Sequence, residues 1–287
     1  MLADGNTLVT ERNIFSYDEL DSTSEEAKRM VRSALAHQTL ALTGLYGSVV
    51  TARRQTAGRG RRGRSFSSPG SGSLYASFIL EPPVNPAEQR ITALAAVAVC
   101  KAIENTTIYK PAIKWINDIL VDGKKVCGIL AEAIPGAVIL GIGVNINLCD
   151  ADFPEELAGI AGSLQMDDLT REHFFEELTA EVFLCTAGAA DETACKNGDD
   201  SAADQYQGIA QGLRSSNCEP GYEAATLMDA YRERSILLGK RVVVMKENEE
   251  RPATAIAVKD DGALVVEYEY GDVDTLRSSR FSIRLVD

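Results

Sequence analysis

Two tight-turn dipeptides between three apolar segments constrain the fold of this chain more than any other feature. Segments 112–121, 124–134 and 137–148 are rich in Ile, Val and Leu, and they are separated by Asp122-Gly123 and Pro135-Gly136. Such short turns join neighbouring strands as antiparallel hairpins. Because helical patterns precede these hairpins, we expect an α+β fold in which helices flank a mixed β-sheet, and not a doubly wound parallel sheet.

Further helices and strands are predicted on both sides of these hairpins. Apolar residues at helical spacing predict a helix that begins just after the tetrapeptide Asp-Ser-Thr-Ser at 21–24. β-rich runs predict strands before and after a segment rich in arginine. The other predicted helices cover 87–105, 168–190 and 223–238, and these strands cover 39–44, 46–52 and 73–80.

The C-terminal segment has the pattern of a separate small unit. From residue 238 onward, four or five short strands alternate with turn segments at 247–250, 260–262 and 270–272. Short, evenly spaced strands are typical of a small β-barrel. We therefore expect two domains, 1–237 and 238–287, with an acidic surface insertion at about 187–221 in the first.

Charge and composition argue against several classes of partner. The 287 residues carry a formal net charge of −13, which repels nucleic acid and anionic membranes at long range. The sequence has no apolar run of transmembrane length and no apolar leader, so we expect a cytoplasmic protein. Its six cysteines form no C-x-x-C pair and it has two histidines, so we expect reduced thiols and assign no residue to a metal.

Residues 58–64, Gly-Arg-Gly-Arg-Arg-Gly-Arg, are called the arginine loop below. Together with Arg53 and Arg54 they place six arginines in twelve residues without an acidic residue. Glycine permits positive φ angles and close approach to a ligand, so amide and guanidinium groups can converge on an anion such as a polyphosphate. By itself the loop also fits a solvated surface loop, a nucleic-acid contact or a basic targeting run.

Other motifs decide between these interpretations. The chain resembles the biotin–protein ligases in the order and spacing of five motifs, at 20–24, 53–66, 114–118, 124–130 and 141–147. The similarity is strong over 20–148 and architectural elsewhere. It implies a catalytic domain of the class II synthetase and biotin–lipoate ligase type at 1–237 and an SH3-like β-barrel at 238–287.

The resemblance also implies a reaction and its partners. Biotin and ATP would be substrates, with Mg²⁺, and would form biotinyl-5′-AMP and pyrophosphate. Biotin would then pass to a lysine of a biotin carboxyl carrier protein domain. About nineteen residues precede Leu20, too few for an N-terminal helix-turn-helix domain, so we expect no specific DNA binding. A homodimer formed by sheet-edge pairing is left open.

Residues of the arginine loop receive roles from the same resemblance. Arg59, Gly60 and Arg61 would cover the biotin carboxylate and the α-phosphate of ATP, and Gln55 would hydrogen-bond the ligand. Closely placed guanidinium and amide donors offset the repulsion between these two anions. Arg62 and Arg64 would contact ATP.

The hydroxyl-rich motif at 22–24 would bind the uncharged ureido ring of biotin. Ser22, Thr23 and Ser24 match the family pattern, except that Ser24 stands where the family has asparagine. Hydroxyl groups can both donate to and accept from such a ring. Capping of the following helix by Ser22 or Thr23 is the alternative.

The motif Lys-Trp-Ile-Asn-Asp departs from the family pattern at Ile116, where proline is usual, and the lost φ restraint could loosen the segment. Asp118 would be catalytic, either through Mg²⁺ or by accepting a proton from the incoming lysine. A turn-forming aspartate is the alternative, and Trp115 fits the core as well as a ligand contact. The complete predicted ATP set is Arg59, Arg61, Arg62, Arg64, Lys114, Trp115, Asn117, Asp118 and Asn145.

Lys125 would bridge the biotin carboxylate and the phosphate, where it stabilises charge that grows in the transition state. An exposed hairpin lysine is the alternative, and Cys127 beside it is interpreted as packing. Together with Asp118 and Arg59, Lys125 forms the predicted catalytic set. The complete predicted biotin set is Ser22, Thr23, Ser24, Gln55, Arg59, Gly60, Arg61, Lys125, Gly128, Gly141 and Gly143.

Three alternative functions stay open at this point. A lipoate–protein ligase would share the fold and the two-step chemistry. A nucleic-acid-binding module could use the arginine loop and the barrel. A degenerate ligase that binds without transfer would account for Ile116 and for Ser279 and Arg280, which depart from the glycine–glutamate pattern of the family's C-terminal domain.

Overall fold

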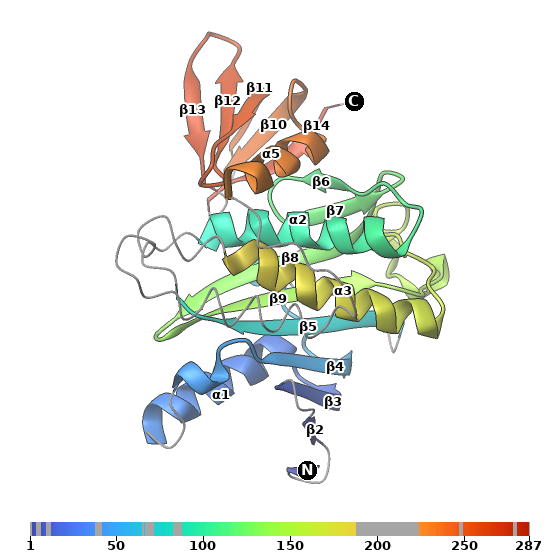
Figure 1. The fold of residues 1–287 in the computed structure, drawn as a ribbon. Helices are drawn as coiled ribbons and strands as arrows, with labels where there is room; N and C mark the ends of the chain where they lie inside the picture. Colours follow the sequence, from blue (N-terminus) through green and yellow to red (C-terminus); the bar gives the residue numbers. More distant parts are fainter. Residues whose placement is uncertain are drawn as a thin grey trace.

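The structure is a computed structural model that describes residues 2–3, 7–9, 13–37, 42–64, 66, 72–82, 88–187, 224–246, 249–277 and 280–286. Within these residues the strands form two sheets, of nine and five strands. Helices cover the large sheet, and the small sheet packs at its β6–β7 end (Figure 1).

The large sheet is mixed, as the sequence predicted. Its strand order is β1-β2-β3-β4-β5-β9-β8-β7-β6. β3 and β4 pair in parallel, and the other pairs of named strands in the described part are antiparallel. The strands are β1 (Leu2–Ala3), β2 (Thr7–Val9), β3 (Ile14–Leu20), β4 (Val49–Gln55), β5 (Ser73–Leu80), β6 (Ala112–Lys114), β7 (Asp118–Val121), β8 (Lys124–Ile134) and β9 (Ala137–Asn145).

The two predicted hairpins form. β7 pairs with β8, and β8 with β9, across the turns at Asp122-Gly123 and Pro135-Gly136. Asp122, Gly123 and Gly136 have positive φ values of 50°, 77° and 80°. Asp and Gly tolerate this left-handed region, which explains why these dipeptides stop each strand and reverse the chain.

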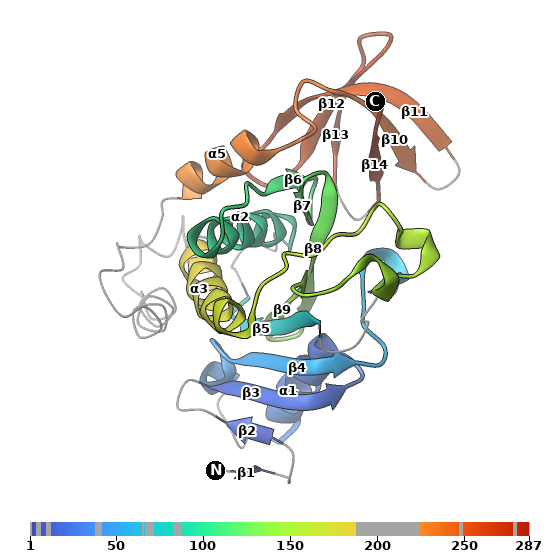
Figure 2. The same ribbon diagram turned by 90° about the vertical axis from the view of Figure 1, so that its right-hand side faces the viewer.

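Helices cover both faces of the large sheet. α1 (Thr23–His37) packs on one face, and α2 (Glu88–Thr106) and α3 (Asp168–Ala187) pack on the other (Figure 2). α1 buries Ala27 and Val31 against Ile79 and Ile139, whereas Phe78 and Leu140 belong to the core of the opposite face. The alternation of side chains along β5 and β9 therefore serves two cores. A fourth helix, α5 (Ala224–Arg234), leads toward the small sheet.

The C-terminal segment contains five strands, but its sheet is open. The order is β13-β12-β11-β10-β14, so β13 and β14 are edge strands and do not pair with each other in the described part. The sequence predicted the strands correctly and a closed barrel wrongly, since two edge strands of four residues each leave the sheet unclosed. The strands are β10 (Arg241–Lys246), β11 (Glu249–Val258), β12 (Leu264–Tyr268), β13 (Val273–Leu276) and β14 (Ser282–Leu285).

Three further predictions need correction. Residues 42–44 of the strand predicted at 39–44 belong instead to a 3-10 helix, Leu42–Leu45, which is closed by the bonds Tyr46 N–H to Thr43 O and Ser48 N–H to Leu45 O. The segment 112–121, predicted as one strand, is β6 and β7 with a turn at 115–117. β1, β2 and β3 precede α1 and were not predicted.

Some predictions lie outside the described residues. Residues 188–223, which hold almost all of the predicted insertion, are among them, as are 38–41 and Ser279. The helix predicted at 168–190 is described as far as Ala187. The domain boundary at 238 stays a prediction. No helix in the described part is long and apolar enough to cross a membrane.

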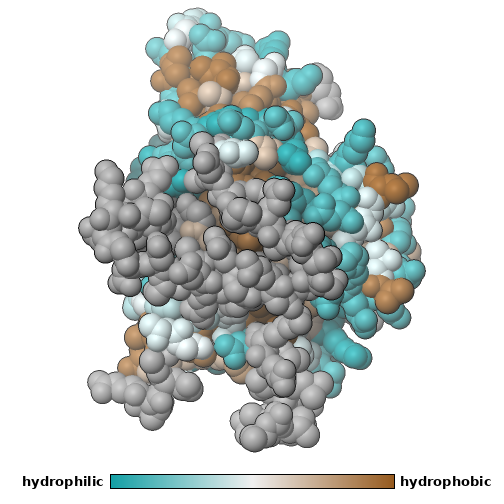
Figure 3. All heavy atoms as spheres, in the orientation of Figure 1, coloured by the Kyte–Doolittle hydropathy of each residue, from teal (hydrophilic) through white to brown (hydrophobic). Residues whose placement is uncertain are grey.

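The two sheets share one hydrophobic core, and a hydrogen bond from Trp115 helps to link them. Val242 and Val266 of the small sheet belong to the same buried cluster as Ile113 and Ile116. Trp115, which is 5% exposed, donates its indole N–H to the carbonyl of Gly262 across 2.9 Å. Elsewhere on the small sheet apolar residues such as Ile256 and Val273 are exposed, and hydrophobic surface is visible there in Figure 3.

Trp115→Phe should destabilise the protein by about 2 kcal/mol, because it removes this bond, leaves the Gly262 carbonyl without its donor and reduces buried volume. Urea unfolding followed by circular dichroism measures the effect, since Trp115 is the chain's one tryptophan and cannot serve as a common fluorescence probe. Tyr270→Phe, at a side chain 93% exposed, is the control. An unchanged midpoint for Trp115→Phe would contradict the proposed link.

Candidate active site

A cavity of about 440 Å³ lies on the α1 side of the large sheet, a volume typical of small-molecule sites. It is enclosed by the start of α1, the arginine loop, the β6–β7 turn, β5, β8, β9 and β14. All predicted site residues but one line it. They are Ser22, Thr23, Ser24, Gln55, Arg59, Gly60, Arg61, Arg62, Arg64, Lys114, Trp115, Asn117, Asp118, Lys125, Gly128, Gly141 and Gly143.

The parallel pair β3–β4 brings the two main predicted motifs together. Strands that run in the same direction end at the same edge, and Leu20 at the end of β3 is in register with Gln55 at the end of β4. The serine–threonine motif therefore begins beside the start of the arginine loop. Backbone bonds from Thr56 N–H to Leu20 O, at 2.9 Å, and from Ala57 N–H to Asp21 O, at 2.8 Å, extend this pairing past the strands.

The floor of the cavity is a stripe of small and polar residues on β5 and β9. Tyr75 is in register with Gly143, and Ser77 with Gly141. A Cβ atom at Gly141 would lie 2.6 Å from Ser24 Oγ, and one at Gly143 would lie 2.7 Å from the Phe66 ring. Both glycines are therefore required by close approach, which is why glycine occurs twice on this face of β9.

A hydrogen-bonded group of buried hydroxyls joins the start of α1 to the floor. The Thr23 amide donates to Gln55 Oε1 at 2.8 Å, and the Thr23 hydroxyl lies 3.2 Å from the same atom. Ser77 Oγ is 2.8 Å from Thr23 Oγ1 and 3.0 Å from Ser24 Oγ. This end of the cavity is neutral and rich in hydroxyl groups.

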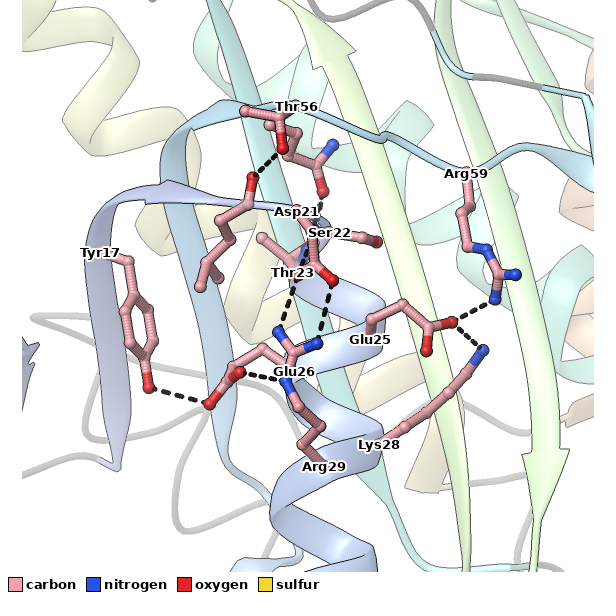
Figure 4. Close-up of polar contacts among 12 residues, drawn as sticks. Tyr17, Asp21, Ser22, Thr23, Glu25, Glu26, Lys28, Arg29, Thr56 and Arg59 are labelled. Atoms are coloured by element: carbon pink, nitrogen blue, oxygen red, sulfur yellow. Dashed lines mark hydrogen bonds and ion pairs between the residues drawn. The ribbon is translucent and has the colours of Figure 1, made fainter.

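The arginine loop is fixed by contacts with three different elements. Arg59 pairs with Glu25 of α1, which also binds Lys28 (Figure 4). Arg61 donates to Asn117 Oδ1 at 2.7 Å, in the β6–β7 turn. Arg62 has a φ of 58° and donates to Ser282 Oγ of β14 at 2.6 Å. The small sheet therefore contributes to the closure of the cavity.

Lys125 and Asp118 form an ion pair at the other side of the cavity, with Nζ and Oδ1 separated by 2.7 Å. Asp118 is in register with Gly128, where a Cβ atom would lie 3.4 Å from Lys125 Nζ. Glycine at this position leaves room for the lysine side chain. Lys124 instead lies 3.7 Å from Asp150 and is 44% exposed.

The lining is strongly cationic although the chain is acidic. Its basic residues are Arg59, Arg61, Arg62, Arg64, Lys114, Lys125 and Arg284, and Asp118 is the one carboxylate among the described lining residues. Burial lowers the pKa of Arg61; the positive charges of Arg62 and Arg64 act in the same direction and Asp118 opposes them. The guanidinium stays protonated at neutral pH, so the site holds excess positive charge that an anion can neutralise.

The donor set tests whether Mg²⁺ fits this cavity. No group of three His, Cys, Asp or Glu side chains is placed to hold a metal within the described residues. Mg²⁺ is commonly held by one or two carboxylates together with substrate phosphates and water. Asp118 can be such a carboxylate, so the site fits Mg²⁺ that arrives with a nucleotide and does not form a protein-only metal cage.

Several residues occupy places that the motifs did not specify. Asn145, predicted to contact adenosine, lies outside the cavity lining and donates to the Gly162 carbonyl at 2.9 Å, so that role stays a prediction. Ile116 is fully buried. Its burial anchors the segment that the absence of proline could have loosened. Cys127 is buried, and burial raises its pKa, in line with packing rather than thiol chemistry.

Sequence reasoning missed part of the lining. Tyr75 lies on the floor, and Met245, Phe281, Ser282, Ile283 and Arg284 come from the small sheet. Ser73, Tyr75 and Ser77 alternate with apolar residues in the predicted strand 73–80. That pattern could have indicated a polar face. No comparable signal marks the residues of the small sheet, which reach the cavity through tertiary packing alone.

These features define a class of protein: an α+β domain with a cavity between a neutral hydroxyl cluster and an arginine-rich loop. Residues 31–148 match the family described as biotin/lipoate A/B protein ligase.

Proteins of known function also match part of the chain. The chain is 38% identical over 165 residues to the bifunctional ligase/repressor BirA of Bacillus subtilis, covering 55% of this chain and 48% of that protein. It is 36% identical over 138 residues to the biotin–[acetyl-CoA-carboxylase] ligase of Paracoccus denitrificans, covering 46% of this chain and 52% of that protein. The chain therefore spans about half the length of these curated relatives.

Among solved structures, the biotin protein ligase from Aquifex aeolicus in complex with biotin and ATP matches with a TM-score of 0.66 and 23% identity. The match covers 96% of this chain and 100% of that one. It shows that the two proteins share a fold across nearly the whole chain.

Tyr75→Phe should raise the free energy of unfolding by about 1 kcal/mol in the ligand-free protein. The Tyr75 hydroxyl is buried and has no hydrogen-bond partner among the described residues, and such a group costs stability. Tyr46→Phe is the matched control: its hydroxyl donates to the Gly136 carbonyl at 2.8 Å, so its removal should cost about 1 kcal/mol. Urea unfolding measures both, and destabilisation by Tyr75→Phe would contradict the assignment.

Proposed function

We propose that this protein is a biotin–protein ligase. It activates biotin with Mg·ATP to biotinyl-5′-AMP and pyrophosphate, and then transfers biotin to a lysine of a biotin carboxyl carrier protein domain. The observation that carries this proposal is the juxtaposition, in one cavity, of a neutral hydroxyl end and a cationic end. Biotin has the same two parts, an uncharged cyclic urea and a carboxylate.

The neutral end accommodates the ureido ring. Ser22, Thr23 and Ser24 line it together with Gln55, and these groups supply donors and acceptors without charge. Gly141 and Gly143 leave the floor open there. A ring placed at this end directs the acyl chain toward the arginine loop and Lys125.

In the first step the biotin carboxylate attacks the α-phosphorus of ATP, and the bond to the leaving pyrophosphate breaks. Two anions must approach each other for this to occur. Arg59, Arg61 and Lys125 surround the place where they meet, and pre-oriented cations lower the energy of such a transition state. Arg59 would exchange its contact with Glu25 for the ligand.

In the second step the amine of the carrier lysine attacks the acyl carbon, and the bond to AMP breaks. The amine has an ordinary pKa of about 10.4 and must lose a proton as it attacks. Asp118 is the carboxylate of the described lining, and its oxygen is held 2.7 Å from Lys125. Asp118 would accept that proton directly or orient the nucleotide end through Mg²⁺.

The arginine loop would also shield the adenylate from water. Its bond from Arg62 to Ser282 connects it to the small sheet on the opposite side of the cavity. A mixed anhydride hydrolyses in water, so exclusion of solvent protects it until the carrier arrives.

The proposal includes the partners expected from the sequence. The carrier domain is the macromolecular substrate, the location is cytoplasmic, and the net charge of −13 disfavours DNA binding. β1 is an edge strand of the described sheet and could pair in a homodimer, whereas the edge of β6 is bridged by Ser235 and Ile236.

Lipoate attachment is the second candidate, because the family that matches residues 31–148 includes ligases of both cofactors. Exchange of labelled pyrophosphate into ATP, measured with biotin and separately with lipoate, distinguishes them. Exchange with lipoate alone would overturn the proposal. Biotin binding without exchange would indicate a degenerate ligase, and salt-dependent retention of DNA or RNA without biotin binding would favour a nucleic-acid-binding module.

Lys125→Ala should reduce labelling of a carrier domain by labelled biotin and Mg·ATP by a factor of about 10² to 10³, because it removes a cation placed at developing charge. Lys124→Ala is the matched control: the neighbouring lysine points to Asp150 and does not line the cavity, so labelling should be nearly unchanged. Absence of labelling by the wild type, or equal rates for the two variants, would contradict the assigned role.

A further inference from the structure

A fully buried hydroxyl that is not part of the cavity lining connects two hydroxyl groups at the neutral end of the cavity. Ser77 on β5 is 0% exposed, and its Oγ contacts both Thr23 and Ser24. Its position is fixed by the register of β5 with β9, which places Ser77 opposite Gly141. The missing side chain of Gly141 leaves the space that Ser24 Oγ occupies, 2.6 Å from where a Cβ atom would be.

The directions of the hydrogen bonds in this group follow from its chemistry. The Thr23 amide can only donate, so the Gln55 atom that it contacts is the carbonyl oxygen. That oxygen can only accept, and the Thr23 hydroxyl therefore gives its proton to it. The Ser77 hydroxyl must then donate to Thr23 Oγ1.

One hydroxyl carries one proton, so the remaining direction is also determined. Because the Ser77 proton points to Thr23, Ser77 Oγ accepts the proton of Ser24 across 3.0 Å. The result is a one-way chain from Ser24 through Ser77 and Thr23 to Gln55. Thr23 and Ser24 have no hydroxyl proton left, and both present oxygen lone pairs alone to the cavity that they line.

We propose that Ser77 is a positioning residue that completes this chain of protons. Gln55 sets the direction of the Thr23 hydroxyl, Ser77 sets that of Ser24, and both hydroxyls are thereby acceptors selective for a ligand with N–H donors. The inference rests on the proposed function, in which the ligand group at this end is the cyclic urea of biotin. Its ureido nitrogens carry N–H groups. A ring that offers acceptors in their place would meet oxygen lone pairs and bind poorly.

Replacement of Ser77 tests the chain directly. Ser77→Ala and Ser77→Cys in the full chain should each raise the Kd for biotin by about tenfold or more. Alanine removes the hydroxyl, and the thiol of cysteine fills the space but is too weak a hydrogen-bonding group to hold Thr23 and Ser24 in place. The Kd for Mg·ATP should be unchanged. Titration calorimetry measures both constants.

Ser73→Ala is the matched control. Ser73 lies on the same face of the same strand, is equally buried, and its hydroxyl has no partner among the described residues. It does not line the cavity. Its replacement should leave the Kd values for biotin and Mg·ATP unchanged.

Biotin derivatives methylated at a ureido nitrogen supply a readout that a purely structural role would not change. The wild type should lose affinity for them relative to biotin, and Ser77→Cys should show a smaller loss, because its acceptors are no longer oriented.

Recovery of wild-type biotin affinity by Ser77→Cys, or equal affinities for the Ser77 and Ser73 variants, would overturn the positioning role alone. Failure of the wild type to bind biotin would overturn the proposed function and the ligand assignment with it. Ser77→Cys leaves no cavity, because the thiol is slightly larger than the hydroxyl, so the test stays decisive if Ser77→Ala does not fold.

Discussion

The parallel pairing of β3 with β4 is the constraint on which the site depends. Two strands that run in the same direction end at one edge, and the chain after each of them carries one of the two predicted ligand-binding motifs. An antiparallel pair would place these motifs at opposite ends of the sheet. The pairing also allows the Thr23 amide to reach Gln55 and Glu25 to reach Arg59, so that each motif helps to position the other.

The second constraint is the strict alternation along β5 and β9. One face of this pair supplies Phe78 and Leu140 to the core beneath α2 and α3. The other supplies Tyr75 and two glycines to the cavity lining and places Ser77 behind the hydroxyl groups. A shift of the register by one residue would exchange these faces and destroy core and cavity together. The stability of the core therefore enforces the geometry of the site, which explains how a floor of small residues stays rigid enough to orient hydroxyl groups.

The sequence predicted the chemistry of the site better than its construction. Motifs such as the arginine loop and Lys125 are short and local, and nearly all of their residues line one cavity. The hairpins were predictable because Asp122, Gly123 and Gly136 are suited to positive φ values. β3 was not, since its pattern gives no clear alternation, and the parallel pair was therefore missed. Contacts such as Arg62 with Ser282, which are 220 residues apart, depend on tertiary packing that no local pattern encodes.

The two ends of the cavity are suited to two different kinds of recognition, electrostatic attraction and hydrogen bonding. At the arginine loop, an excess of cations attracts any anion of suitable size, and this attraction is strong but weakly selective. At the hydroxyl end, each hydrogen bond of a neutral group contributes less binding free energy. A buried group that a ligand leaves without a hydrogen bond nevertheless weakens binding. Selectivity for the ligand should therefore reside in Thr23, Ser24 and Gln55, and the driving force for activation in Arg59, Arg61 and Lys125. Because the hydroxyl motif and the arginine loop follow the same strand pair, β3–β4, the proposed function would have a ligand that satisfies the hydroxyls also place its carboxylate beside the arginines.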